Sequence, residues 1–247
     1  MNISRSACAP HALRAISLAG AELNSPVEWG AHTPGTGGRF RKWEWPAESP
    51  LAALPRPDGF VQAEAATAGW FIGGYGTAED GTTRPVCWDW EFRAADMLPP
   101  CAKSGVIVAA DPDCGPEVTG LGGSVSIVGG SEHYRAAFWP NPPRNTIIDL
   151  HPIAPEYVAS SVYAVRWDGA RMQQAGMAVY EPVGSPARRS CHAMAWRGSA
   201  VSAIDLHELL PEQFLQSTAT FIDEAGNIAG AAQDANGIWH AVFWARR

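Results

Sequence analysis

The chain has 247 residues, enough for one large domain or two small ones. Hydrophobic residues make up 46% and charged residues 17%, so a packed globular core is expected and disorder is not. The formal net charge is -7, and the basic residues are 16 Arg and two Lys scattered along the chain. Because no positively charged stripe could follow a phosphate backbone, nucleic acid is not an expected partner.

Membrane insertion and export are not expected either. No apolar run approaches the roughly 18 residues that cross a bilayer as a helix. Residues 1–18 contain Arg5 and Arg14 but no continuous apolar segment of the kind found in a secretory signal, and this predicts a cytoplasmic protein. The 5 cysteines form no C-x-x-C pair and are expected to be incidental thiols, although Cys101 and Cys114 could close a loop in an oxidising compartment.

A segment that ends in tryptophan recurs along the chain at intervals of about 50 residues. In chain order the copies lie at residues 40–43 (FRKW), 85–88 (PVCW), 136–139 (AAFW), 193–196 (AMAW) and 241–244 (AVFW). The third and fourth copies are followed by I-D-L-H at 148–151 and 204–207, and the first two by weaker versions at 53–55 and 96–99. A second pattern, a strand of small residues that ends at glycine, lies between the anchors at 68–74, 124–130 and 225–230.

Each repeat offers four short extended segments separated by Gly, Pro, Asn and Asp, which is the strand content of a propeller blade. The residues before Trp43, together with the few after Trp244, supply a fifth unit. The sequence therefore predicts an all-β fold in which residues 1–247 form one domain, a single closed five-bladed β-propeller of four-stranded antiparallel blades. The repeated aromatic residues are expected to pack between adjacent blades, at Trp43, Trp88, Trp139, Trp196 and Trp244.

The last unit stops at its third strand, at Trp244. Its missing outer strand is expected from residues 2–5, because pairing the two termini would remove an exposed sheet edge.

The succession H-A-x-x-W, I-D-L-H-P, a small-residue strand and G-x-I-x-G resembles the HAF repeats, also called probable extracellular repeats. The resemblance is good over residues 130–247, fair over 60–130 and poor before 45. It implies a propeller-like repeat fold and carries no common activity. The family label suggests export, whereas residues 1–18 predict a cytoplasmic protein.

In such a blade the starts of the first and third strands and the ends of the second and fourth meet at one rim, here called the top rim. All seven histidines are expected there. Asp149 and Asp205 stand two residues before His151 and His207, hence on the same side of an extended strand. The candidate ligand-binding residues on this rim are His133, Tyr134, Arg135, Asp149, His151, Glu156, Tyr157, Asp205, His207, Trp239 and His240.

These residues predict recognition of a small polar ligand, a glycan or a protein at the top rim, since binding groups collect on loops of a rigid scaffold. The alternative is an enzyme that uses the rim His and Asp or Glu residues as acid/base groups or metal ligands. A third possibility is a stable partner protein, for which the negative charge suits a basic surface. Against a catalytic role, D-L-H and H-A-x-x-W are repeated positions whose side chains could simply bond to neighbouring backbone where blades meet. No catalytic residue, metal site or cofactor is assigned, and the links between third and fourth strands on the opposite rim, such as 197–199, are expected to be short.

Overall fold

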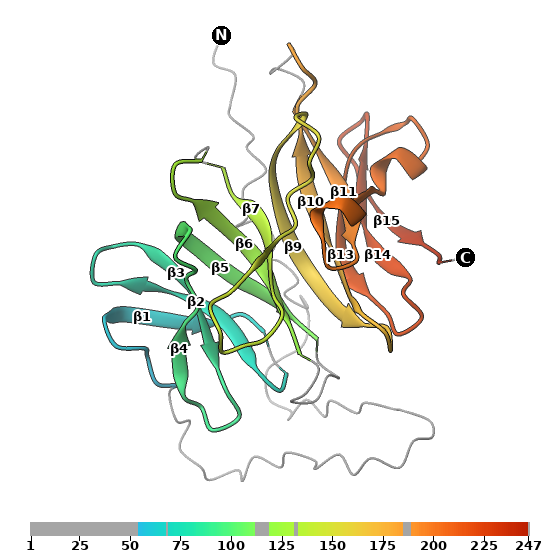
Figure 1. The fold of residues 1–247 in the computed structure, drawn as a ribbon. Helices are drawn as coiled ribbons and strands as arrows, with labels where there is room; N and C mark the ends of the chain where they lie inside the picture. The colour runs from blue at the N-terminus through green and yellow to red at the C-terminus, as the bar shows by residue number, and fades with distance from the viewer. Residues whose placement is uncertain (1–53, 68, 112–118, 131–132, 185–188, 247) are drawn as a thin grey trace, which may run out of the picture. The chain divides into compact units, whose positions relative to one another are not determined.

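The computed structural model describes residues 54–67, 69–111, 119–130, 133–184 and 189–246. They belong to one of two units into which the chain divides, Leu54–Arg247, the other being Met1–Ala53. The described residues form four antiparallel sheets that follow one another in chain order (Figure 1). The first sheet contains β1 (Phe60–Ala65), β2 (Ile72–Ala78), β3 (Thr83–Trp88) and β4 (Ala94–Asp96); the second contains β5 (Ala102–Ala110), β6 (Leu121–Ile127), β7 (Arg135–Trp139) and β8 (Ile148–Asp149). The third contains β9 (Tyr157–Trp167), β10 (Met172–Tyr180), β11 (Ser190–Trp196) and β12 (Ile204–Asp205); the fourth contains β13 (Phe214–Ile222), β14 (Ile228–Asp234) and β15 (Trp239–Trp244).

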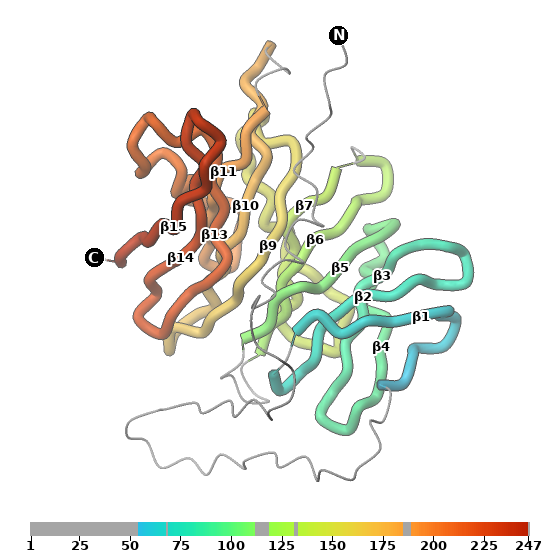
Figure 2. Tube along the Cα trace, turned by 180° about the vertical axis from the view of Figure 1, so that it is seen from behind, coloured from blue at the N-terminus to red at the C-terminus, as the bar shows by residue number. Residues whose placement is uncertain are grey.

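Every sheet is a meander in which consecutive strands pair. Among the first strands, β5 contacts β9 and β9 contacts β13 (Figure 2). We call the first strand of each sheet the inner strand and the fourth strand the outer strand. Helical structure in the described residues is limited to two short 3-10 turns, η3 (Ala200–Ser202) and η4 (His207–Leu209). The all-β prediction with four-stranded antiparallel sheets is therefore confirmed.

A glycine at the middle of each second strand lets the inner strand approach closely. A Cβ on Gly74, Gly123, Gly176 or Gly230 would lie 1.9–2.0 Å from a carbonyl oxygen of the paired inner strand, a distance that no side chain tolerates. The predicted position of the small-residue strand in the second sheet is wrong, because this strand spans Leu121–Ile127 and not 124–130. Both segments contain a glycine pair, but only Gly123 faces the inner-strand backbone in the way Gly176 does.

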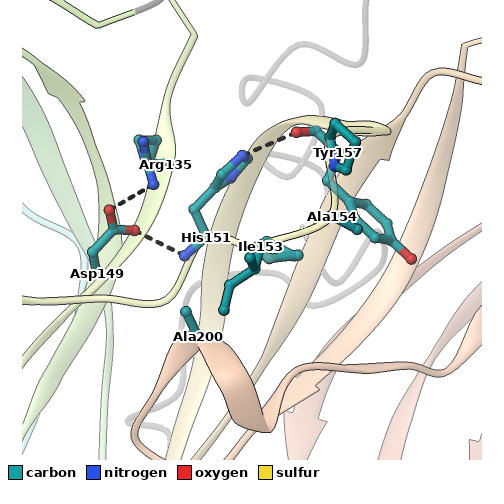
Figure 3. Close-up of a pocket in the computed structure, with 9 residues that line it drawn as sticks. Arg135, Asp149, His151, Ile153, Ala154, Tyr157 and Ala200 are labelled. Atoms are coloured by element: carbon teal, nitrogen blue, oxygen red, sulfur yellow. Dashed lines mark hydrogen bonds and ion pairs between the residues drawn. The ribbon is translucent and has the colours of Figure 1, made fainter. Parts of the chain in front are cut away.

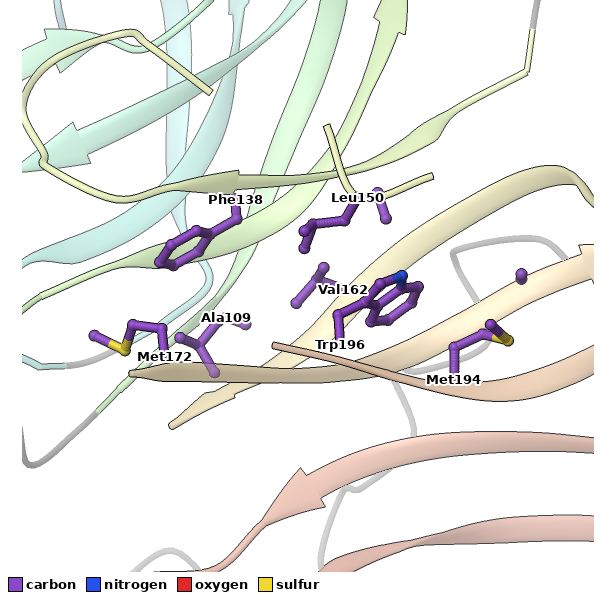
Figure 4. Packing of buried hydrophobic residues seen from close by; sticks show 10 residues of the cluster. Ala109, Phe138, Leu150, Val162, Met172, Met194 and Trp196 are labelled. Carbon is purple, nitrogen blue, oxygen red and sulfur yellow. The ribbon is translucent and has the colours of Figure 1, made fainter. Parts of the chain in front are cut away.

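The tryptophan anchors lie between sheets. Trp139 packs with Phe71 and Met97 of the first sheet, and Trp244 packs with Leu206 of the third. Trp196 packs with Phe138, Leu150 and other side chains of the second sheet (Figure 4). The predicted packing between adjacent sheets is confirmed for these three anchors, and Trp43 lies outside the described residues.

The indole groups also reach back to the preceding outer strand. Trp139 Nε1 donates to the Met97 carbonyl at 3.0 Å, and Trp244 Nε1 donates to the Leu206 carbonyl at 3.0 Å. Trp88 Nε1 donates to the Pro55 carbonyl at 2.6 Å in the same way. Trp196 departs from the pattern, because its Nε1 is buried and has no hydrogen-bond partner. Three of the four described anchors, Trp88, Trp139 and Trp244, are thus fixed by packing and by one directional bond.

In the part of the chain that the structure describes, the fourth sheet has three strands, and one of its faces carries exposed apolar side chains. Phe243 is 64% exposed, whereas Phe138, which precedes its tryptophan anchor in the same way, is 3% exposed under the third sheet. Phe221 is 58% exposed and Ala109, which also directly follows a register shift on an inner strand, is 4% exposed. The described residues therefore show four sheets and no closed sheet, rather than the five expected. The fifth unit and the closing strand at residues 2–5 fall outside the described residues.

The links between third and fourth strands differ from the prediction. Residues 197–203 contain η3, and residues 140–147 contain a turn in which the Arg144 amide donates to the Asn141 carbonyl. These links are not the short turns that were expected, because the outer strands are brief and the chain must travel further to reach them.

Candidate functional site

The two D-L-H segments make the same local contacts. Asp149 Oδ1 accepts the His151 amide at 2.9 Å, and Asp205 Oδ1 accepts the His207 amide at 2.8 Å. Asp96 Oδ1 accepts the Leu98 amide at 2.9 Å in the first sheet, where leucine stands in place of histidine. The aspartate thus shapes the end of the outer strand in all three sheets, with or without a histidine.

The two histidines connect one sheet to the next. His151 Nδ1 lies 2.7 Å from Ser160 Oγ on β9, and Ser160 Oγ accepts the Ala136 amide of β7 at 2.8 Å. His207, Ser217 and Ala193 repeat this arrangement one sheet later, with distances of 2.8 and 2.9 Å. We call each set of three a His–Ser strut. Each strut satisfies a buried main-chain amide, which is costly to leave unpaired.

The first sheet shows what happens when the amide is missing. Pro85 takes the place of Ala136 and Ala193, because its carbonyl accepts the amide of Met97 as theirs accept the amides of Leu150 and Leu206. Proline has no N–H to satisfy. The serine position is then Gly105, where a Cβ would lie 3.5 Å from Pro85 Cδ, and the histidine position is Leu98. Histidine and serine are therefore present together where an amide needs a partner and absent together where it does not.

The tautomer of His151 follows from its contacts. Its Nε2 lies 3.0 Å from the Tyr157 carbonyl, which can only accept, so Nε2 carries the proton and Nδ1 accepts the Ser160 hydroxyl hydrogen. Burial, helped by the charge of Arg135, lowers the pKa of His151 below its ordinary value. His151 is thus held in the neutral form.

A basic residue at the third strand pairs with the aspartate of each outer strand. Arg84 donates to Asp96 Oδ2 at 3.1 Å, and Arg135 donates to Asp149 Oδ2 at 2.8 Å. In the third sheet the basic residue is a histidine, His192, whose Nδ1 lies 2.6 Å from Asp205 Oδ2. The third sheet therefore contains a titratable base where the first two contain arginine.

Aromatic rings surround Asp205. The Tyr157 hydroxyl donates to Asp205 Oδ2 at 2.7 Å, and the His192 ring stacks on Tyr180 at 4.7 Å and lies 4.2 Å from the His207 ring. Burial opposes ionisation of Asp205, but hydrogen bonds from His192 and Tyr157 outweigh it and hold the pKa of this carboxyl below its usual value. Burial and the Asp205 charge raise the pKa of Tyr157, so its hydroxyl stays protonated as a donor. Burial and the neighbouring His192 lower the pKa of His207.

A cavity of about 390 Å³ lies beside the Arg135–Asp149 pair and His151. Four candidate residues, Arg135, Asp149, His151 and Tyr157, line it together with Pro152, Ile153, Ala154, Pro155 and Ala200 (Figure 3). Ala200 belongs to the link between β11 and β12, so this cavity joins the top-rim residues to a segment that was expected at the opposite rim. Arg135 brings one further feature, since its Nε is buried and has no hydrogen-bond partner.

The candidate residues divide into separate groups. A chain of contacts crosses the second and third sheets through Arg135, Asp149, His151, Tyr157, Asp205 and, by its main-chain amide, His207. Trp239 is exposed on the fourth sheet, and His240 pairs with Asp234 at 3.0 Å and packs on Phe214. Tyr134 and Glu156 use their carbonyls to accept the amides of Ser160 and Glu181, and His133 is not one of the residues that line the cavity. The predicted list thus mixes one connected set with five residues outside it.

Two residues of the Asp205 cluster were not among the candidates. Ser190 and His192 lie two residues apart on β11, with Ser190 Oγ 3.0 Å from His192 Nε2. The H-A-x-x-W pattern marks His192, but its partner is apparent only once β11 and β12 pair, with Met194 opposite Asp205. Their role therefore depends on a tertiary contact.

The second cavity and the described thiols make weaker candidates for a functional site. A cavity of about 290 Å³ lies near the ends of three inner strands and includes Arg166, which already pairs with Glu224 at 3.2 Å. No group of three or more His, Cys, Asp or Glu side chains in the described part of the chain is arranged to hold a metal ion. Burial raises the pKa of the Cys87 thiol to about 12. Cys101 is a free, exposed thiol, so it does not close the loop considered with Cys114, and Cys191 is disulfide-bonded rather than an incidental thiol. None of these groups adds to the site between the second and third sheets.

Comparison with known proteins gives no relative. No family model, no curated protein and no solved structure matches the chain. In the residues that the structure describes, no helix is long and apolar enough to cross a membrane.

Proposed function

We propose that the protein is a propeller of the HAF-repeat type that binds a small polar ligand in the cavity between the second and third sheets. The observation that carries the proposal is that the Arg135–Asp149 pair and His151 meet small apolar side chains in the lining of that cavity. The Arg135 side chain is 38% exposed, so its guanidinium can donate to an oxygen of a bound ligand. The volume of about 390 Å³ falls within the range of small-molecule sites.

The lining favours a neutral ligand. Asp149 already neutralises Arg135, and His151 is neutral, so the polar side of the cavity carries no net charge. Ile153, Ala154 and Ala200 form an apolar side. A polar group facing an apolar surface is the environment that a sugar ring prefers, so a neutral monosaccharide or the end of a glycan is the ligand class we propose.

The test is a substitution that fills the cavity with a larger side chain at Ala200, a residue that belongs to neither His–Ser strut. Ala200→Trp projects a large side chain into the lining, and Val201→Trp, at a neighbouring residue that is 79% exposed and does not line the cavity, is the matched control. Saturation-transfer NMR with a panel of neutral mono- and disaccharides should show binding to the native protein and to Val201→Trp, and none to Ala200→Trp. Absence of binding by the whole panel, or equal binding by both variants, would refute the proposal.

The catalytic alternative for His151 and His207 has less support, because both rings bond to serine hydroxyls within the fold. Changing either to Ala should lower the melting temperature. An unchanged melting temperature together with loss of a measured activity would instead favour the enzyme.

We further propose that residues 1–53 supply a fifth sheet and close the ring. Three observations support this: the exposed face around Phe243 and Phe221 matches positions buried in other sheets, β15 lacks an outer strand, and 53 residues equal about one repeat. Such a sheet would cover Phe243. Phe243→Ser should then cost about 1.5–3 kcal/mol of stability, and Val201→Ser, at a solvent-exposed position, should cost almost nothing.

The proposed pairing of residues 2–5 with β15 provides a second test of ring closure. Deletion of residues 1–6 should remove several main-chain hydrogen bonds, each contributing about 1 kcal/mol. If both the deletion and Phe243→Ser left the urea midpoint unchanged, the ring would not close in this way.

A further inference from the structure

Ser190, His192 and Asp205 stand in a line of hydrogen bonds. Ser190 Oγ lies 3.0 Å from His192 Nε2, and His192 Nδ1 lies 2.6 Å from Asp205 Oδ2. Nucleophile, base and orienting carboxylate within such distances are the arrangement by which a serine hydroxyl is activated. None of the three residues lines the proposed sugar cavity, so chemistry at Ser190 is independent of the proposed function.

The protons on this line can be placed. Asp205 accepts hydrogen bonds from the Tyr157 hydroxyl and from the His207 amide, and both interactions favour its ionised form. The ionised carboxylate has no proton to give, so His192 Nδ1 must carry the proton between them. His192 Nε2 is then left with a lone pair that accepts the Ser190 hydroxyl hydrogen.

The first sheet contains the same line of residues without a base. Arg84 Nε donates to Thr82 Oγ1 at 2.9 Å, and Arg84 also pairs with Asp96. Thr82 and Arg84 occupy the positions of Ser190 and His192, two residues apart and next to Pro85, the counterpart of Ala193. Arginine cannot accept a proton from a hydroxyl. The fold therefore accommodates an arginine here, and the histidine of the third sheet is not required for the sheet to form.

The surroundings of Ser190 suit an uncharged electrophile. Ser190 is partly exposed at the start of β11, whereas His192 is buried under the Tyr180 ring, so a substrate can reach the hydroxyl while the base is shielded from water. The neighbouring Arg189 is neutralised by an ion pair with Glu181. The hydroxyl is thus accessible, and the described charged side chain next to it is already paired.

We propose that Ser190 is a base-activated nucleophile that reacts with small carboxylic esters. Ser190 Oγ attacks the ester carbonyl carbon, and its proton passes to His192 Nε2. The carbon–oxygen bond to the leaving group breaks, the alcohol departs with the proton from His192, and an acyl-serine remains. A water molecule, deprotonated by the same nitrogen, then attacks the acyl-serine and releases the carboxylic acid and the free hydroxyl. Asp205 acts as a positioning residue that fixes the tautomer of His192.

The test uses two probes on the full chain, p-nitrophenyl acetate and an alkyl fluorophosphonate. The fluorophosphonate forms an O–P bond at Ser190 as the P–F bond breaks, and peptide mapping by mass spectrometry locates the adduct. We expect one adduct per chain, on Ser190, and a burst of p-nitrophenolate from the ester. Ser190→Ala should show neither, and Ser104→Ala, a partly exposed serine of β5, should behave as the native protein does.

His192→Arg is the decisive variant, because it recreates the line seen at Arg84 and should fold normally. General-base assistance contributes about 10²- to 10⁴-fold, so the labelling rate should fall by that factor while the melting temperature stays within a few degrees. An unchanged labelling rate in His192→Arg, an adduct on another residue, or no reaction of the folded native protein would overturn the proposal. If His192→Arg does not fold, His192→Gln is measured in its place, with the same expected loss of labelling.

Discussion

The His–Ser strut makes a quantitative prediction about Ser160. Ser160 is 2% exposed, and its hydroxyl oxygen accepts the buried Ala136 amide while its hydrogen bonds to His151. Ser160→Ala leaves the amide without a partner, which costs about 1–3 kcal/mol, and removes a hydrogen bond that contributes about 0.5–1.5 kcal/mol. The free energy of unfolding, measured by urea denaturation, should therefore fall by about 1.5–4.5 kcal/mol.

A buried serine without a strut is the matched control. Ser126 is 3% exposed, and its Oγ has no hydrogen-bond partner, so Ser126→Ala removes an unsatisfied group and should leave stability within about 0.5 kcal/mol or raise it. The reasoning is refuted if Ser160→Ala and Ser126→Ala change the free energy of unfolding equally. His151→Leu should also cost about 0.5–1.5 kcal/mol less in the Ser160→Ala background than alone, because the bond between the two side chains is then already absent.

Three further predictions concern pH, the anchors and the central glycines. The folded pKa of His151 lies below its ordinary value of 6.5, so the unfolded chain takes up the proton first as pH falls. The melting temperature should therefore be highest above about pH 7 and fall towards about pH 5, and less steeply in His151→Leu. Trp139→Phe loses a bond to a main-chain carbonyl whereas Trp196→Phe removes a buried unpaired N–H, so urea denaturation should show a cost about 1–2 kcal/mol larger for Trp139. Gly123→Ala should abolish soluble expression, because its Cβ would lie 2.0 Å from a carbonyl oxygen, while Gly81→Ala, in an open turn at φ +79°, should cost only about 1 kcal/mol.

Much of the fold could be predicted from the tryptophan period, because each anchor fills the space between two sheets and must recur once per sheet. Trp139, Trp196 and Trp244 follow this rule in the structure. The register of the second sheet could not be predicted, since glycine pairs occur at 122–123 and 129–130 and sequence does not reveal which one faces the inner backbone. Glycine marks a close approach only after the neighbouring strand is in place.

The sequence indicated some members of the cluster around Asp149 and Asp205 but not the side chains that they bond to. The spacing of Asp149 and His151 correctly put both at the end of an outer strand, and the structure shows that the aspartate accepts the histidine amide. The same spacing could not distinguish a strut from a ligand contact, because that depends on Ser160, which is local to neither residue. Ser190 escaped notice for the same reason, as its line to Asp205 runs across two strands.

The indole hydrogen bonds give the stack of sheets a direction along the chain. In three of the four sheets the tryptophan donates to a carbonyl that precedes it in sequence, at Pro55, Met97 or Leu206. During synthesis on the ribosome, each of these acceptors has therefore left the exit tunnel before its donor does, so each indole finds its acceptor already made. Removing repeats from the carboxyl end would leave every remaining indole with its acceptor, whereas removing them from the amino end would orphan the next tryptophan. The His–Ser struts run in the opposite direction, because the Ala136 and Ala193 amides are satisfied by serines of the following sheet. Trimming from either end therefore breaks one of the two kinds of bond between sheets.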